Sequence, residues 1–325
     1  MRTTWRLGSS GSMLLILLLV WTAPATAQKV TLIAVGDICL ANGVEQKMCA
    51  VAPGYPFAGM QKHLKRADIV FGNLECCLAT CGNKVPKKYN FRGNPRNVKA
   101  LRAAGFTVVS LANNHSLDFG KDALAESITH VRGAGIVAVG AGMTIRSARA
   151  LRIITIRGTR VGFLAYLGLF PSIMPLTANK PAIAMAELET IKRDVAAARG
   201  KVDILIVSMH AGKEYTFTHN ARQEAIAYTA IDAGADMVIG HHPHVVQDTE
   251  IYKDRPIFYS LGNFIFDPSP TFLRDRGKRW SAMVAATFEK GKRPDARLID
   301  LRIVDRQPRF ATQTGAASAM EMLRR

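Results

Sequence analysis

The chain has 325 residues, 48% hydrophobic and 21% charged, a composition that is typical of a globular protein and excludes a disordered or fibrous one. Lysine and arginine number 43 against 25 acidic residues, which gives a formal net charge of +18. Such a charge favours a polyanionic partner. The basic residues are scattered and no nucleic-acid-binding motif accompanies them, so we expect no nucleic acid partner.

The first 27 residues have the features of a signal peptide. Arg2 and Arg6 precede an apolar run at 13–21, and Ala25-Thr26-Ala27 is a small-residue cleavage pattern. The apolar run is shorter than the about 20 residues that a membrane span needs. We therefore expect an exported protein, periplasmic or extracellular, whose residues 28–325 form one domain. An uncleaved N-terminal membrane anchor is the alternative.

All five cysteines fall in the first third of the chain, where an exported protein can form disulfides. Because five is odd, at least one cysteine stays free, pairs between chains or binds metal. Cys77 with Cys81 would close a local loop, and Cys49 with Cys76 is another pairing. The spacing does not decide between these possibilities.

Apolar runs and helical patterns alternate along the chain, which predicts a layered α/β core. Residues 168–180 are rich in proline and without a period, and are expected to be a surface connection, with a substrate-facing lid as the alternative. We expect strands at 29–35, 69–71, 106–111, 136–139, 202–207, 235–238 and 256–264, two more within 281–304, a hairpin at 151–167, helices at 57–66, 94–105, around 124–131, around 188–195 and at about 221–232, and a short terminal helix.

The predicted strands end in polar residues, and the carboxyl ends of strands are where a sheet presents its loops. His242 and His244 form an HxH pair, which on an extended backbone places two imidazoles on one side. Imidazoles and carboxylates together can hold one or two of the cations Mn, Fe or Zn. The strand-end residues are Asp37, Asn73, Glu75, Asn114, His115, His210, His241, His242, His244 and Asn263.

Six motifs carry a resemblance to a known family. They occur at 36–37 (GD), 72–75 (GNLE), 112–120 (ANNHSLDFG), 210–215 (HAGKEY), 240–244 (GHHPH) and 259–264 (YSLGNF). In this order, from about residue 30 to 268, they resemble the CapA family of capsule-biosynthesis proteins, which make or export poly-γ-glutamate. The fold of that family resembles the calcineurin-like metallophosphoesterases. The resemblance implies a four-layer αββα sandwich with two mixed β-sheets flanked by helices.

The resemblance also implies roles for individual residues. Cys39 stands where the phosphoesterases have a histidine ligand, and Glu75 stands where they have a bridging aspartate. Asn114 and His115 match a ligand and catalytic pair. The implied metal ligands are Asp37, Glu75, Asn114, His210, His242 and His244, and further possible site residues are Cys39, Asn73, Glu214, His241 and Asn263.

Three functions are consistent with these residues. The first is a role in biosynthesis or export of poly-γ-glutamate or a similar anionic polymer through a divalent-metal centre, with membrane capsule-assembly proteins as possible partners. The second is metal-dependent hydrolysis of a phosphoester substrate. The third is epimerisation of a glutamyl or peptidyl substrate, in which a metal and a histidine base remove a proton next to a carbonyl.

Overall fold

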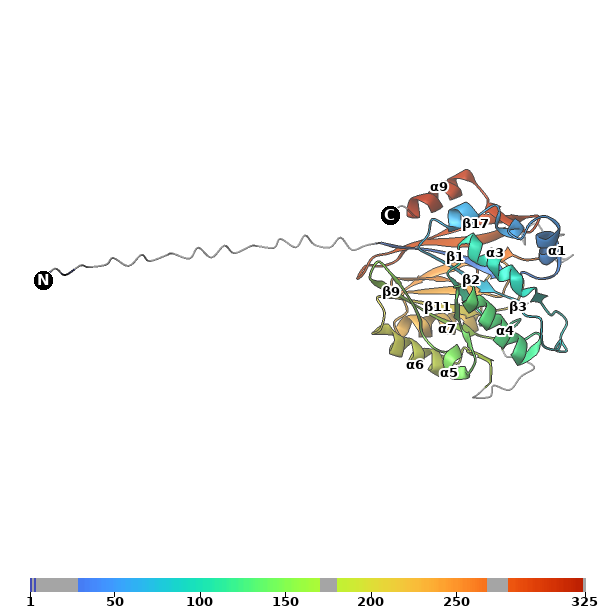
Figure 1. Cartoon of the computed structure of the whole chain (residues 1–325), viewed down its shortest axis with the longest axis horizontal. Coiled ribbons are helices and arrows are strands. Elements are labelled where there is room, and N and C mark those ends of the chain that lie inside the picture. The colour runs from blue at the N-terminus through green and yellow to red at the C-terminus, as the bar shows by residue number, and fades with distance from the viewer. Residues whose placement is uncertain (2, 4–28, 170–179, 268–279, 324–325) are drawn as a thin grey trace.

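The computed structural model describes residues 1, 3, 29–169, 180–267 and 280–323 (Figure 1). The predicted signal peptide at 1–27 and most of the predicted loop at 168–180 lie outside these residues, and the domain limits 28–325 stay a prediction. Within the described part of the chain, no helix has the length and hydropathy that a membrane span requires.

Two mixed sheets form the centre of the fold. The larger has the order β18 (Gln307–Phe310), β17 (Asp295–Val304), β16 (Trp280–Phe288), β1 (Val30–Ile38), β2 (Ile69–Leu74), β5 (Val108–Ser110) and β6 (Val137–Val139), and β15 (Asn263–Ile265) pairs with β1. The smaller has the order β13 (Thr249–Tyr252), β14 (Arg255–Phe258), β12 (Met237–His241), β11 (Ile204–His210), β9 (Thr159–Leu167) and β8 (Arg152–Ile156).

The two sheets pack face to face across a continuous apolar core. Side chains of both sheets contribute to it, and the rings of Phe71 on β2 and Phe163 on β9 stack with centroids 5.7 Å apart. A second apolar cluster lies between the smaller sheet and the helices α6 (Leu188–Arg199) and α7 (Ala221–Asp232). The burial of these apolar faces holds the layers together.

Helices cover the outer faces, as Figure 1 shows for α9 (Gln313–Met322) beside β17 and for α6 and α7 below the smaller sheet. The four-layer αββα sandwich is therefore confirmed. The remaining elements are α1 (Asn42–Ala50), η1 (Tyr55–Phe57), α2 (Gln61–Leu64), β3 (Cys77–Leu78), β4 (Arg92–Gly93), η2 (Pro95–Asn97), α3 (Val98–Ala104), α4 (Gly120–Gly133), β7 (Ala141–Gly142), α5 (Ile145–Ala148) and β10 (Ala182–Ile183).

Two predicted elements were wrong in extent. The helix expected at 57–66 is only the short turns η1 and α2. The single strand expected at 256–264 is divided between the sheets: β14 belongs to the smaller sheet, and β15 pairs with β1 in the larger one. Gly262, with a φ of +68°, supplies the left-handed backbone at which the chain crosses over.

This crossing brings the backbone of Gly36 and Gly262 into close contact. A Cβ at Gly36 would lie 1.9 Å from the carbonyl oxygen of Gly262, and the amide of Asp37 donates a 2.9 Å hydrogen bond to that oxygen. Only glycine at position 36 therefore lets β1 and β15 approach closely enough to place Asp37 opposite Asn263.

We predict that Gly36→Ala lowers the free energy of unfolding by about 1–3 kcal/mol or more, because the added methyl group forces the two strands apart. Gly133→Ala at the end of α4 is the matched control, since a Cβ there meets nothing within 4 Å. Urea denaturation of both variants measures the effect. Equal midpoints for Gly36→Ala and the wild type would show that the close approach is unimportant.

Candidate metal centre

Asp37 ends the central strand of the larger sheet. In the register of this sheet it lies opposite Asn73 on β2 and opposite Asn263 on β15. The carboxylate is fully buried, and its Oδ1 accepts a 2.8 Å hydrogen bond from Asn73 Nδ2. Burial alone would raise the pKa of Asp37, but the nearby imidazoles of His241 and His244 hold it well below its usual range.

Glu75 follows β2 and lies at the middle of the cluster. Its carboxylate is fully buried, and neither oxygen has a hydrogen-bond partner among the described residues. Glu75 Oε1 lies 3.5 Å from His210 Nε2 and 3.9 Å from the Nε2 atoms of both His115 and His244. Burial, followed by the charge of Asp37, raises the pKa of Glu75 well above its usual value. A buried carboxylate without a partner is costly unless a cation completes its environment.

His242 and His244 come together through a turn rather than along an extended strand, which corrects the expected geometry. β12 ends at His241, and the backbone then adopts φ values of +101° at His242 and +59° at His244. This left-handed backbone is rare for residues with a side chain, and such conformations cluster at functional sites. The turn directs both imidazoles toward Glu75, with ring centroids 5.9 Å apart.

The two ring nitrogens of His244 have different roles: Nδ1 is held by neighbouring side chains, and Nε2 can bind a metal. Its Nδ1 donates a 2.9 Å hydrogen bond to Asn263 Oδ1 and lies 3.3 Å from Asp37 Oδ2, while Nε2 faces Glu75. Burial lowers the pKa of His244, but the carboxylates of Glu75 and Asp37 outweigh burial and raise it to about 10, so a cation that binds at Nε2 would displace a proton from it. A fixed Nδ1–H with a free Nε2 is the usual arrangement of a metal-binding histidine.

His210, at the end of β11, is held by two amide side chains. Its Nε2 lies 2.8 Å from Asn114 Oδ1, and Asn73 Nδ2 lies 3.2 Å from its Nδ1. His241 pairs with His210 in the register of the smaller sheet. Both of its ring nitrogens are buried without a hydrogen-bond partner in the described part of the chain, and Nδ1 lies 3.4 Å from Asp37 Oδ1.

The ligand atoms form two groups that share Glu75. One consists of Glu75, His242 and His244, the other of Asp37, Glu75 and His210, and within each group the atoms lie within 4.8 Å of one another. The unpartnered oxygens of Glu75 and the unpartnered Nδ1 of His242 are the atoms that a cation would satisfy. The residues therefore fit a pair of divalent cations that share one carboxylate, and imidazole with carboxylate suits Mn, Fe or Zn.

His115 lies beside this cluster and is oriented by residues that the sequence did not single out. Its Nδ1 donates a 2.8 Å hydrogen bond to the buried carboxylate of Asp118, which also accepts from the amide of Phe91. Lys87 forms an ion pair with Asp118 and donates a 2.8 Å hydrogen bond to the carbonyl of Asn114. Asp118 could have been identified from the sequence, because it follows His115 by three residues. No local sequence feature indicates Lys87.

Two possible site residues lie apart from the candidate ligand groups. The thiol of Cys39 is buried and in contact with Cys76, and burial together with that contact raises its pKa well above the usual value. It is not in either ligand group. Glu214 is exposed on the loop after β11, so it contributes charge near Glu75 rather than a ligand atom.

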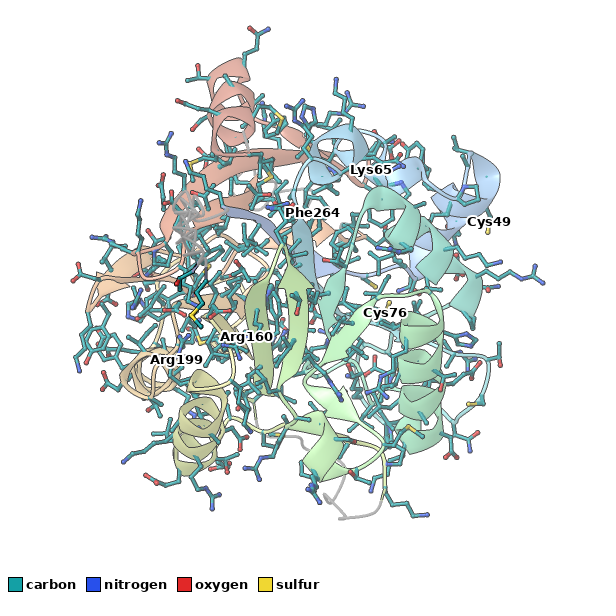
Figure 2. All side chains as sticks on the ribbon, turned by 60° about the vertical axis from the view of Figure 1, so that its left-hand side comes forward. Cys49, Lys65, Cys76, Arg160, Arg199 and Phe264 are labelled. Atoms are coloured by element: carbon teal, nitrogen blue, oxygen red, sulfur yellow. The ribbon has the colours of Figure 1, made fainter. Side chains whose placement is uncertain are left out.

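Neither of the two possible cysteine pairings is present, since all five cysteines are free thiols in the structure. Cys49 lies exposed on α1 at the edge of the molecule, whereas Cys76 is buried in its interior (Figure 2). Cys77 is buried and Cys81 exposed. Each possible pair therefore combines an interior thiol with a surface thiol.

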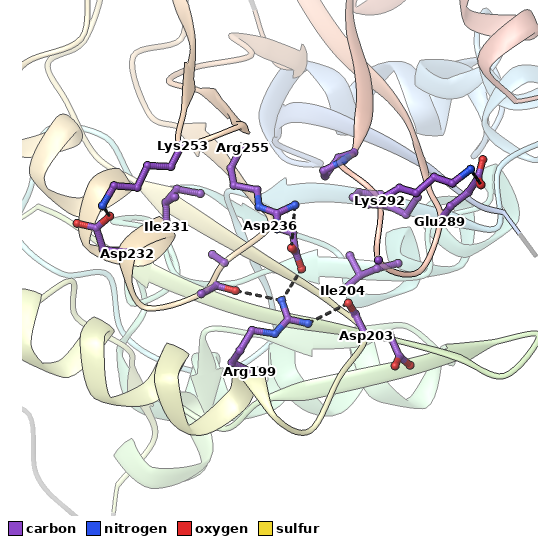
Figure 3. A pocket seen from close by; sticks show the side chains of 15 residues that line it. Arg199, Asp203, Ile204, Ile231, Asp232, Asp236, Lys253, Arg255, Glu289 and Lys292 are labelled. Carbon is purple, nitrogen blue, oxygen red and sulfur yellow. Dashed lines mark hydrogen bonds and ion pairs between the residues drawn. The ribbon is translucent and has the colours of Figure 1, made fainter. Parts of the chain in front are cut away.

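A separate hollow of about 400 Å³ lies at the opposite ends of β11 and β12 (Figure 3). The guanidinium of Arg199 fills part of it, pairing with Asp236 at 2.5 Å and donating to the carbonyls of Gly234, Val202 and Asp203. Arg255 also pairs with Asp236, at 3.3 Å. The lining balances four basic side chains against four acidic ones, namely Arg199, Lys253, Arg255 and Lys292 against Asp203, Asp232, Asp236 and Glu289. The hollow contains none of the candidate metal ligands.

The sequence matches the family model described as bacterial capsule synthesis protein PGA_cap over residues 31–268. It is 32% identical over 308 residues to the capsule biosynthesis protein CapA of Bacillus anthracis, covering 89% of this chain and 75% of that protein. It is 31% identical over 244 residues to the PGA biosynthesis protein CapA of Bacillus subtilis, covering 74% of this chain and 64% of that protein.

Solved structures support the fold. A putative 5'-nucleotidase from Staphylococcus aureus has a TM-score of 0.56 at 12% identity, covering 91% of this chain and 58% of that one. A hypothetical protein from Thermus thermophilus has a TM-score of 0.52 at 19% identity, covering 83% of this chain and 99% of that one. At these identities the likeness shows a shared metallophosphatase-like architecture and nothing about the reaction.

We predict that Mn²⁺ at about 100 times its Kd raises the Tm of the wild-type protein by roughly 5 °C and leaves that of Glu75→Gln almost unchanged. Glutamine keeps the shape of Glu75 but removes the charge that both ligand groups share. Cys39→Ala is the matched control and should keep the full metal-dependent shift. Differential scanning fluorimetry of the three proteins checks this. A full shift in Glu75→Gln would contradict the shared role of Glu75, and its loss in Cys39→Ala would make Cys39 part of the centre.

Proposed function

The chain belongs to the bacterial capsule synthesis protein family PGA_cap, and from this premise we propose that it processes a poly-γ-glutamate-like anionic polymer at the metal centre. Relatives named for capsule or PGA biosynthesis match most of the chain. The observation that carries the proposal is the His115–Asp118 pair, in which His115 faces Glu75, the residue that both candidate ligand groups share. This arrangement supports hydrolysis of a link in the polymer.

Asp37, Glu75, His210, His242 and His244 would hold the cations, with Asn114 beside His210. Divalent cations in this position would supply positive charge that lowers the pKa of water and polarises the group under attack. The large net positive charge of the chain, +18, supports attraction of a polyanion before it reaches the centre.

His115 is suited to accept a proton. With Nδ1–H bonded to Asp118, the lone pair is on Nε2, which is the atom that faces Glu75. Burial lowers the pKa of His115, and the hydrogen bond and charge of Asp118 offset only part of that effect, so the imidazole is neutral at pH 7. Asp118 also forms an ion pair with Lys87, and its hydrogen bond with Nδ1 fixes the orientation of the His115 ring.

We also propose that the protein is exported. This is supported by residues 1–27, in which basic residues, an apolar run and a small-residue cleavage pattern follow one another. The partner proteins of capsule assembly stay a prediction, as does the epimerase alternative. Hydrolysis of phosphoesters is the second candidate, supported by the match of Asn114 and His115 to a ligand and catalytic pair, and it is an outcome of the following test.

We predict that the Mn²⁺-loaded wild-type chain releases new amine ends from poly-γ-glutamate and that His115→Gln lowers this rate by about 10²–10⁴-fold, because the proton acceptor is lost. His130→Gln is the matched control, since His130 lies on α4 and pairs with Glu126 at its own helix surface. Fluorescamine labelling of amines and the size of the polymer measure the reaction.

Equal rates in His115→Gln and the wild type would contradict the role of His115. A wild-type protein that hydrolyses an aryl phosphate and leaves the polymer intact would favour the phosphoesterase alternative.

A further inference from the structure

Three aromatic side chains from distant segments form a continuous series of ring contacts with the imidazoles of the centre. Phe91 lies 4.2 Å from the His115 ring and 5.5 Å from Phe266, measured between centroids. Phe266 lies 4.9 Å from the His244 ring, and Tyr215 lies 6.0 Å from the same ring. We call Phe91, Phe266 and Tyr215 the aromatic arc.

The aromatic arc places apolar rings beside the imidazoles of the centre. Its rings contact the imidazoles of His115 and His244, whose Nε2 atoms face Glu75. Phe91 and Phe266 are half-buried, and Tyr215 keeps 41% of its surface exposed. In the proposed reaction these three rings neither transfer a proton nor bind a metal. A solvent-exposed ring next to a reactive imidazole is suited to contact a part of the substrate that does not react.

The loop that carries Tyr215 is held rigidly although it presents aromatic rings to solvent. Tyr215 N donates a 2.8 Å hydrogen bond to the carbonyl of Pro243, and the buried amide of Gln247 donates 2.9 Å hydrogen bonds to the carbonyls of Thr216 and Thr218. Gln247 in turn accepts from Gln223 at 2.8 Å. Phe217, two residues from Tyr215, is 54% exposed. Rigid presentation reduces the entropy cost of binding a ligand against these rings.

The other end of the arc is reached by a basic segment. Residues 84–92 contain four cations, Lys84, Lys87, Lys88 and Arg92, and no acidic residue, and Phe91 is part of this segment. Lys87 pairs with Asp118. Lys84 and Lys88 are exposed. Aromatic surface next to exposed positive charge complements a ligand that has apolar carbon segments between anionic groups.

We propose that the aromatic arc is a subsite that binds the carbon chain of an acidic polymer next to the reacting link. The methylene groups of the polymer pack on Tyr215 and Phe266, and its carboxylates face the basic segment 84–92. This inference rests on the proposed function and adds to it the residues that select an aliphatic polycarboxylate over other polyanions.

The test compares binding of two polyanions to the full chain at one fixed ionic strength, by fluorescence anisotropy of labelled poly-γ-glutamate and labelled dextran sulfate. Tyr215→Ala should weaken binding of poly-γ-glutamate about tenfold and leave dextran sulfate unchanged, because only the former packs methylene groups on the ring. Tyr215→Phe, which keeps the ring, should bind as the wild type does. Ile251→Ala is the control, since Ile251 is 54% exposed on β13, outside the arc.

The outcomes separate the two claims. If the wild type binds poly-γ-glutamate and Tyr215→Ala binds it equally well, the subsite is overturned and the proposed function stands. If Tyr215→Ala weakens both polyanions alike, the ring gives no selectivity and the subsite is again overturned. If the wild type binds no poly-γ-glutamate, the proposed function fails and the subsite fails with it.

Discussion

The buried carboxylate of Glu75 is the constraint on which the centre depends. It lies away from water, has no hydrogen-bond partner in the described chain, and faces imidazoles from three separate segments. Leaving such a group uncompensated costs several kcal/mol, and a neutral or metal-bound state avoids this cost. Both candidate ligand groups contain Glu75, so the residue that is unfavourable alone would be the shared ligand of two cations.

The architecture supports that carboxylate by bringing strand ends together from both sheets. Asp37 and Asn73 lie side by side in the larger sheet, and His210 and His241 do so in the smaller one. The close contact of Gly36 with Gly262 lets the crossing chain place Asn263 against His244. Parallel strands explain why polar residues far apart in sequence meet at one edge.

Much of this could be predicted from the sequence, because apolar runs with the right periods end in residues of ligand type. Asp37, Glu75, His210, His242 and His244 were identified in this way and by family resemblance, and the structure brings them together. The left-handed turn at His242 and His244 could not be predicted, since β-type spacing and a turn give the same HxH pattern. Lys87 and Phe266 were missed because only the tertiary fold brings them to His115 and His244. Cys39 was assigned by position alone, whereas packing against Cys76 decides its environment.

The most direct test of the account is the metal content of the wild-type protein, purified without chelator or an affinity-tag histidine run and dialysed against Mn²⁺, Fe²⁺ or Zn²⁺ in turn. Inductively coupled plasma mass spectrometry against protein concentration gives the stoichiometry. We expect close to two equivalents of at least one of these cations, because Glu75 belongs to two ligand groups. One equivalent would contradict the shared carboxylate, and no bound metal with any of the three would contradict the centre itself.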